Sequence, residues 1–146
     1  MAAFTTNVTV DRPVGEVWAK FMSVDAMGKW MTGFKSVETI AGKPETVGSK
    51  HRMRFEERGR LVEMIETVTA IRPNEEYAFD MDMPELSGHV SVRFLSNGRS
   101  TEIRTDNEFR PKMLLWKMMV PFLKSGMAKR QTTDFLKLKQ LIESER

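Results

Sequence analysis

The sequence contains no cysteine. This excludes a disulfide framework, a thiolate nucleophile and any zinc site with cysteine ligands. Histidine is also scarce, because only His51 and His89 are present. The strand patterns described below place these two residues on opposite faces of a sheet, so we expect no metal site.

The chain also lacks an excess of charge of one sign. Its 23 Lys and Arg residues nearly balance its 20 Asp and Glu residues, which leaves a net charge of +3. The charges are interspersed along the expected strands. Because a nucleic-acid binder carries a basic patch or stripe, we expect no nucleic-acid partner.

No apolar run is long enough to span a membrane. Charged residues at Asp11, Arg12, Glu16 and Lys20 interrupt the region where a signal peptide would need a continuous apolar stretch. We therefore expect a cytoplasmic protein. The one compositional excess is 12 methionines, and methionine suits a cavity that accepts varied apolar shapes.

The order of the expected elements is the most informative positive feature. One strand and two small helices precede alternating strands from about Phe34 to Phe109, and a helical stretch of about thirty residues closes the chain. With 146 residues the chain is long enough for one domain, which we place at 1–146. A lone long helix, spanning roughly 45 Å, must cross the sheet and tends to leave a hollow beneath it. A small molecule would bind there.

The first elements follow clear periodicities. Alternation in Phe4–Val10 predicts a strand, and apolar residues at i, i+3, i+4 and i+7 from Val14 to Phe21 predict a helix. A second short helix is expected over Val24–Met31, ended by Gly33. A loop is expected over Ala41–Ser49.

A two-residue turn at Arg58-Gly59 fixes the faces of the first hairpin, because a shift of one residue would exchange them. The predicted pairs are His51 with Glu66, Met53 with Met64 and Phe55 with Val62 inside, and Arg54 with Glu63 outside.

Asn97-Gly98 predicts a second hairpin with a type I′ turn. The predicted pairs are Phe94 with Thr101, Val92 with Ile103 and Val90 with Thr105 inside, and Arg93 with Glu102 and His89 with Asp106 outside. Between the hairpins, alternation predicts that Tyr77, Phe79, Met81 and Met83 also point inward. The polar residues on this apolar inner face are His51, Glu66, Tyr77, Thr105 and Asn107.

The terminal helix changes character along its length. Nearly every residue of Met113–Leu123 is apolar, whereas an ordinary amphipathic pattern follows Gly126. The two apolar stripes are out of phase by roughly 220°, so we expect a kink at Pro121 or at Ser125-Gly126. The first segment is then either a mobile piece over the mouth of the hollow or a helix buried against the sheet edge.

Four segments in this order and spacing resemble the SRPBCC superfamily, also called START-like or polyketide cyclase/dehydrase-like. They are "VTVDRPVGEVWAKFMSVDAMGKWM", "VGSKHRM", "VTAIRP" and "FLKLKQLIE". The resemblance implies an α+β helix-grip fold, in which a curved antiparallel sheet of about seven strands wraps around a long C-terminal helix. Members bind lipids, sterols, quinones, polyketides or plant hormones, and some catalyse cyclisation or dehydration. The family offers no universal catalytic residue to carry over.

From these observations we expect a cofactor-independent carrier or sensor of a hydrophobic small molecule, rather than an enzyme. The residues expected to contact the ligand share the inner face or the apolar helical segment, with Trp30 at the entrance. They are Trp30, His51, Met53, Phe55, Met64, Glu66, Tyr77, Phe79, Met81, Val92, Ile103, Thr105, Asn107, Leu115, Met118, Met119 and Phe122.

Alternatives remain open. His51 and Glu66 could form an acid–base pair of a cyclase or dehydratase, although such pairs more often only satisfy each other. A hydrolytic triad is suggested by His89, Asp106 and Ser91, but the predicted register puts these three side chains on the solvent side of the sheet. Residues 113–124 could contact a membrane transiently or form a protein interface, including a homodimer.

Overall fold

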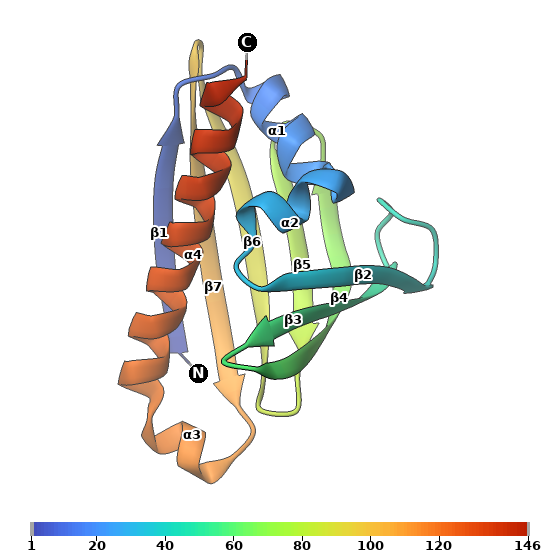
Figure 1. The fold of residues 1–146 in the computed structure, drawn as a ribbon, viewed down its shortest axis with the longest axis vertical. Coiled ribbons are helices and arrows are strands. Elements are labelled where there is room, and N and C mark those ends of the chain that lie inside the picture. Colours follow the sequence, from blue (N-terminus) through green and yellow to red (C-terminus); the bar gives the residue numbers. More distant parts are fainter. Residues whose placement is uncertain (1, 146) are drawn as a thin grey trace.

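The structure, a computed structural model, describes residues 2–145. One sheet of seven antiparallel strands carries α1, α2 and α4 on the same face, with the longest helix running along the sheet (Figure 1). The elements in chain order are β1 (Ala2–Val10), α1 (Val14–Met22), a short 3-10 helix η1 (Val24–Ala26), α2 (Met27–Trp30), β2 (Phe34–Ala41), β3 (Lys50–Glu57), β4 (Arg60–Arg72), β5 (Glu76–Asp82), β6 (Leu86–Asn97), β7 (Ser100–Pro111), α3 (Leu114–Met118) and α4 (Val120–Ser144).

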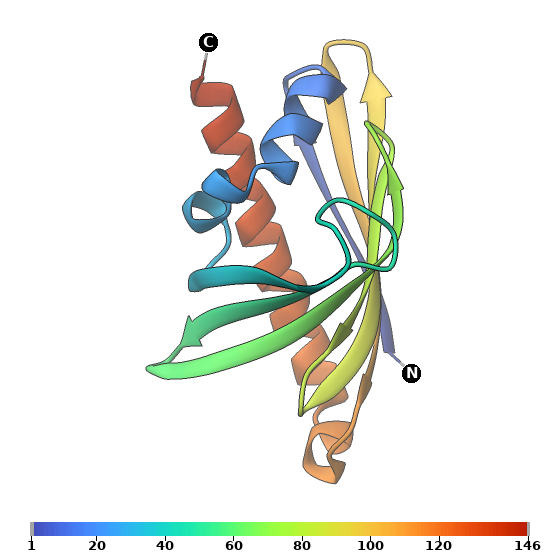
Figure 2. The same ribbon diagram turned by 90° about the vertical axis from the view of Figure 1, so that its right-hand side faces the viewer.

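The sheet order is β1-β7-β6-β5-β4-β3-β2. Strands β2 to β7 therefore follow one another, whereas β1 pairs only with β7, along Ala2–Val10. The β3–β4 hairpin turns away from β5 to β7, so that the sheet curves around the helical side (Figure 2). This confirms the expected α+β helix-grip architecture, including the two short helices after the first strand.

The packed core lies beneath α1, α2 and the C-terminal part of α4. The predicted apolar face of α1 is confirmed, since Val17 and Phe21 are buried. Phe135 of α4 stacks on Trp30 of α2 and on Phe21, with ring centroids 5.6 and 6.4 Å apart. These aromatic contacts fix the helices to each other and to the sheet.

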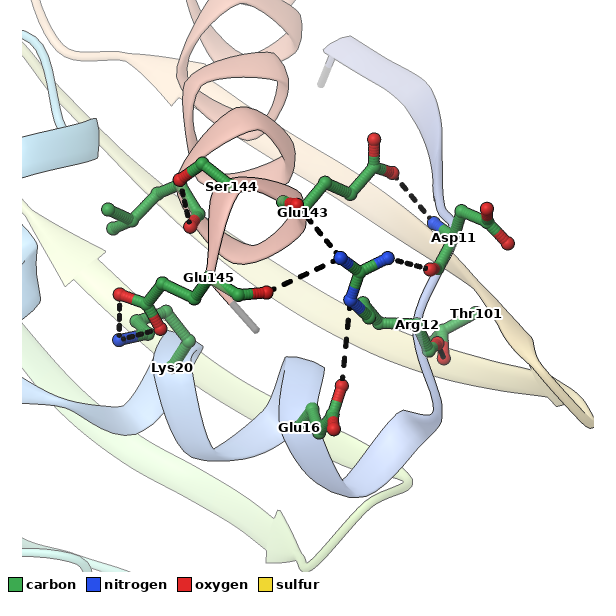
Figure 3. Close-up of polar contacts among 9 residues, drawn as sticks. Asp11, Arg12, Glu16, Lys20, Thr101, Glu143, Ser144 and Glu145 are labelled. Carbon is green, nitrogen blue, oxygen red and sulfur yellow. Dashed lines mark hydrogen bonds and ion pairs between the residues drawn. The ribbon is translucent and has the colours of Figure 1, made fainter.

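A polar cluster holds the C-terminal end of α4 (Figure 3). The Arg12 guanidinium donates to the carbonyl oxygens of Glu143 at 2.8 Å and of Glu145 at 3.4 Å. A cation suits these last carbonyls, which have no partner within the helix. The carboxylate of Glu143 accepts from the backbone N–H of Asp11 at 2.8 Å. This end of the helix is therefore anchored.

The β3–β4 register is the predicted one, with His51 opposite Glu66, Met53 opposite Met64 and Arg54 opposite Glu63. Arg58 and Gly59 have φ values of 51° and 77°. Positive φ at both central residues is what a type I′ turn requires, so the two-residue turn is confirmed.

The predicted β6–β7 register is wrong by two residues. Asn97 pairs with Ser100, so the turn is Gly98-Arg99 and not Asn97-Gly98. Phe94, Val92 and Val90 lie opposite Ile103, Thr105 and Asn107, while Arg93 and His89 lie opposite Arg104 and Glu108. The reason is that Gly98, with φ of 70°, takes the first central position, where a type II′ turn requires glycine. Because side chains alternate between the two faces of a strand, a register shift of two residues leaves every inward residue on the inner face.

The helical stretch is divided at Met119. This residue ends α3 and precedes α4, with a non-helical φ of −100° and ψ of 10°. Pro121 lies in the first turn of α4, where its missing N–H is tolerated. A break near Pro121 is therefore confirmed, whereas Ser125 and Gly126 lie within a continuous helix.

The segment around α3 is not buried against the sheet edge. Leu114, Met118 and Phe122 keep 74%, 73% and 75% of their surface exposed. The expectation of a buried helix is therefore wrong.

Candidate functional site

The inner face of the sheet changes from packed to accessible along the molecule. Beneath the C-terminal part of α4, inward residues such as Val92, Phe94 and Ile103 are buried in the core. On β3 to β5 Met53 and Val68 are buried, but several other inward apolar residues are only half-buried, among them Phe55, Met64, Tyr77, Phe79 and Met81. We call these five residues the accessible inner face. They offer apolar surface that the protein's own side chains do not fully cover.

The helical wall opposite this surface is marked by Arg130, which reaches across from α4. Its guanidinium lies 5.6 Å from the centroid of the Phe55 ring and forms an ion pair with Glu57. It also donates to the carbonyl oxygen of Thr32 at 2.8 Å. Arg130 therefore ties the β3–β4 hairpin to α4.

Two apolar residues of α4 lie on the same side of the helix as Arg130. At 100° per residue, Leu123 and Met127 lie within about 60° of Arg130, and both are half-buried. Neither residue was predicted from the sequence as a ligand contact. The helical spacing could have indicated them, because Met127 and Leu123 precede Arg130 by three and seven residues.

The polar feature of the inner face is a carboxyl–phenol pair. The Tyr77 hydroxyl donates to Glu66 Oε1 at 2.7 Å. Burial raises the pKa of Glu66 to about 6, although the hydrogen bond from Tyr77 acts in the opposite direction. Burial also raises the pKa of Tyr77, so the phenol remains the donor. At neutral pH the pair presents a carboxylate that retains some capacity to take up a proton.

His51 has other partners than Glu66. Ser49 Oγ donates to the carbonyl oxygen of Thr46 at 2.7 Å, so it accepts from His51 Nε2 at 3.1 Å. His51 Nδ1 then accepts from Thr39 Oγ1 at 3.2 Å. Burial lowers the pKa of His51, which favours this neutral form. Although His51 and Glu66 lie opposite each other, the His51 imidazole instead links Thr39 of β2 to Ser49 in the loop before β3.

A reciprocal amide pair joins the sheet to α4. Asn107 Nδ2 donates to Gln131 Oε1, and Gln131 Nε2 donates to Asn107 Oδ1, both at 2.9 Å. Thr6 Oγ1 also donates to Gln131 Oε1 at 2.6 Å. Gln131 was missed, although it precedes Phe135 by four residues and Leu138 by seven and so belongs to their inward stripe. The pair uses the polar atoms of Asn107 to position the helix.

The remaining predicted ligand contacts fall into separate groups. Trp30, Met53, Val92, Ile103 and Thr105 are buried, and Trp30 packs against Phe135 and not at an entrance. Leu115, Met118, Met119 and Phe122 are exposed on α3 and the start of α4. Phe122 lies about 180° around the helix from Gln131, so it faces away from the sheet.

The outer face holds the residues of the rejected triad. His89 Nδ1 lies 2.7 Å from Asp80 Oδ1, and Ser91 donates to Glu76 at 2.7 Å. Asp106 instead pairs with Arg93. His89, Ser91 and Asp106 therefore do not assemble a catalytic triad.

Two open recesses also lie on the outer face. One, of about 400 Å³, includes Arg52, Glu63, Asp82 and Lys112, and the other includes His89, Glu108 and Arg110. In the first, Lys112 pairs with Asp82 and Arg52 lies 4.0 Å from Glu63. Charged, paired walls do not suit an apolar ligand.

Within residues 2–145, no three metal-ligating side chains come together as a metal site. In the same part of the chain, no helix is long and apolar enough to cross a membrane.

Comparison with known proteins gives a family and a fold. Residues 1–143 match the sequence model of a family described as polyketide cyclase / dehydrase and lipid transport. No curated protein matches the sequence.

Solved structures with the same fold share little sequence. A conserved protein from Geobacillus kaustophilus has a TM-score of 0.82 at 16% identity, over 98% of this chain and 96% of that one. The Zhui aromatase/cyclase from a Streptomyces species has a TM-score of 0.81 at 13% identity, over 97% and 93%. Norcoclaurine synthase from Thalictrum flavum, solved with dopamine and hydroxybenzaldehyde, has a TM-score of 0.71 at 14% identity, over 99% and 88%. At such identities the likeness shows the fold alone.

Proposed function

Because the chain belongs to the polyketide cyclase/dehydrase and lipid transport family of the SRPBCC superfamily, we propose that it binds and carries a hydrophobic small molecule. The ligand class is a lipid, a quinone or a polyketide-like molecule. The single observation that carries the proposal is the accessible inner face, because apolar side chains that point inward are normally buried in a protein without a ligand.

Apolar contact would supply most of the affinity. Each Å² of apolar surface that the ligand covers contributes about 25 cal/mol. Leu123 and Met127 would cover the ligand from the side of α4, because they lie on the same side of the helix as Arg130, which lies over the Phe55 ring. Such walls select for size and shape only coarsely.

The Glu66–Tyr77 pair would orient the polar end of the ligand. A carboxylate that is 7% exposed has few competing water molecules, so a hydroxyl or ammonium group of the ligand would gain a strong hydrogen bond to it. Asn107 is less suited to this role, because Gln131 and backbone carbonyls already occupy its amide.

The experiment is a titration with the fluorescent apolar probe N-phenyl-1-naphthylamine, with native mass spectrometry of freshly purified protein for a bound ligand. We expect Phe79→Ala to weaken probe binding at least about fivefold, since it removes apolar contact surface. Leu95→Ala is the matched control, because Leu95 is an exposed residue of the outer face. Equal affinity for both variants would contradict the proposal.

A second candidate function is a cyclase or dehydratase reaction. The pKa of Glu66 near 6 favours it, because a group that titrates near neutral pH both takes up and releases protons. His51 would then support the fold, and Glu66 with Tyr77 would carry the chemistry. If a substrate is found, Glu66→Gln should abolish turnover while the substrate still binds.

The finer expectations of partner and location belong to this proposal as well. They are a cytoplasmic location and, as alternatives for residues 113–124, transient contact with a membrane or an interface such as a homodimer. The membrane contact has further support in the charge pattern around α3.

A further inference from the structure

Positive charge is concentrated in one stretch of this nearly balanced chain. Residues 109–133 contain six basic side chains and no Asp or Glu. The basic residues are Arg110, Lys112, Lys117, Lys124, Lys129 and Arg130. Because the whole chain carries +3, all the other residues together carry a net charge of −3. The charge of the protein is therefore polarised.

Most of these cations lack an intramolecular partner. Of these six residues, only Lys112, with Asp82, and Arg130, with Glu57, form ion pairs within residues 2–145. Arg110, Lys117, Lys124 and Lys129 have no carboxylate within ion-pair distance in the same range. Their charge is available to an external anion.

The same stretch carries a concentration of exposed apolar surface. Twelve large apolar side chains are exposed within residues 2–145, and six of them lie between residues 113 and 122. They are Met113, Leu114, Leu115, Met118, Met119 and Phe122, which we call the apolar tip. The other six are scattered over the chain, as is normal for a surface.

The apolar tip lies at one extremity of the molecule. Both views show α3 beyond the end of the sheet, at the opposite end from the C-terminus (Figures 1 and 2). An extremity can meet a flat surface without obstruction from the rest of the protein. Lys117 lies within α3, and Lys124 and Lys129 follow Phe122 by about 3 and 10 Å along α4.

We propose that the apolar tip docks on a membrane surface that contains anionic lipids. Exposed apolar side chains flanked by lysines are the pattern by which interfacial helices enter the boundary between head groups and acyl chains. The apolar residues would bury themselves there, and the unpaired cations would contact the phosphate groups of the lipids.

Charge decides between a membrane and a second copy of this chain. In a symmetric dimer the same patch lies on both sides of the interface, so two positively charged patches that contain Lys117 and Lys124 would be brought together. An anionic bilayer offers negatively charged head groups to the lysines and an apolar interior to the exposed apolar side chains. The inference deepens the membrane contact named in the proposed function by specifying anionic lipids. It does not depend on the proposed ligand, because it concerns α3 and the first turns of α4 and not the inner face.

The test is co-sedimentation with vesicles of phosphatidylcholine, alone or mixed with phosphatidylglycerol. We expect binding to the mixed vesicles at least about tenfold tighter than to phosphatidylcholine alone, and weaker binding at high salt. Leu115→Ser with Phe122→Ser should reduce binding at least about tenfold. Lys117→Ala with Lys124→Ala should reduce it about fivefold for each charge removed.

Matched controls separate the tip from general surface effects. Val24→Ser with Val47→Ser changes two similarly exposed apolar residues elsewhere, and Lys43→Ala with Lys50→Ala removes two exposed charges elsewhere. Both should bind as the unmodified protein does. Because all these positions are exposed, the variants should fold, and circular dichroism checks this.

Two results would overturn the inference. One is equal binding of the tip variants and the controls. The other is a dimer in sedimentation velocity that Phe122→Ser dissociates, with no vesicle binding by the unmodified protein. Failure of the probe titration above would leave the vesicle result unaffected.

Discussion

Glu66 is the residue with the most unusual chemistry in the molecule. It lies on an apolar face with Tyr77 as its hydrogen-bond donor, and burial raises the pKa of its carboxyl group to about 6. A buried carboxylate is less well solvated than one in water, so the charged form is disfavoured in the folded state. This shift makes the stability of the fold depend on pH.

The first prediction concerns that dependence. Below about pH 4.5 the Glu66 carboxyl group is protonated in both the folded and the unfolded protein, so its contribution to stability is fully present. That contribution is lost as the pH rises through about 6. The shift corresponds to about 2 kcal/mol of unfolding free energy. We expect Glu66→Gln to remove this loss, which urea unfolding at pH 4.5 and pH 8 measures. Glu75→Gln, an exposed change of the same charge, is the control, and an unchanged pH profile in Glu66→Gln would contradict the prediction.

The second prediction is that His51 is not essential for binding. Both ring nitrogens are engaged by Ser49 and Thr39, so the imidazole contributes to the fold more than to a ligand. His51→Ala should change the affinity for the apolar probe by less than about tenfold, or roughly 1.4 kcal/mol. A thousandfold loss, measured by the same titration, would assign His51 to the site.

Which residues face inward could be predicted from the sequence, but not what each one touches. Alternation along each strand assigned His51, Glu66, Tyr77 and Asn107 to the inner face, because successive side chains of a strand point to opposite faces. Their partners depend on loop and helix positions that the pattern does not encode. For this reason the pairing of His51 with Glu66 was a reasonable hypothesis, and the pairing of Asn107 with Gln131 was missed.

At the scale of elements, the two hairpins show what turn chemistry determines. Both turns have two residues, and both contain glycine, but Gly59 is the second central residue and Gly98 is the first. The sequence Asn97-Gly98 favoured the type I′ position for glycine, which misplaced the strand by two residues. Because the predicted register differed by two residues, an even number, the residues of the inner face were still assigned correctly.

The third prediction tests the role of Gly98. Its φ of 70° disfavours a side chain, although a Cβ atom there would meet nothing within 4 Å. We expect Gly98→Ala to destabilise the protein by about 1 kcal/mol through backbone strain alone. Gly126→Ala, in the exposed interior of α4, has equal space and should stabilise by about 0.5–1 kcal/mol. Thermal unfolding gives both values, and the same sign for both would refute the argument.

The fourth prediction concerns hydrogen exchange along α3 and α4. Amides of Leu114–Leu123 belong to exposed turns, whereas those around Leu138 lie over the core. We expect the first group to exchange much faster than the second, because few buried contacts oppose local opening. Equal exchange rates, unchanged by an apolar ligand, would show that the first segment is static.

At the scale of the whole molecule, α4 is held differently at its two ends. Arg12 anchors its C-terminal end, while Arg130 is the main tie between its N-terminal half and the β3–β4 hairpin. The hairpin can therefore separate from the helix only if the contacts of Arg130 break. The order of elements predicted the helix across the sheet, but nothing in the spacing of charges indicated this tie.

The fifth prediction concerns the contacts by which Arg130 holds the β3–β4 hairpin to α4. Arg130→Gln should speed dissociation of the apolar probe about two- to fivefold, in line with the modest strength of partly exposed ion pairs. Lys129→Gln is the matched control, since it removes the same charge from the neighbouring exposed residue. Stopped-flow dilution measures both rates, and equal rates would exclude Arg130 as the tie.

The position of β1 beside β7 has a consequence for synthesis of the protein. About ninety residues separate Val10 from its partner Thr101, which corresponds to about 5–20 s of translation. During that time β2 to β6 can form successive hairpins, while the first strand has no partner. Its apolar side chains at Phe4, Val8 and Val10 stay available to chaperones until β7 leaves the ribosome. Because β1 then covers the free edge of β7, the same late step that completes the fold also removes a site for aggregation.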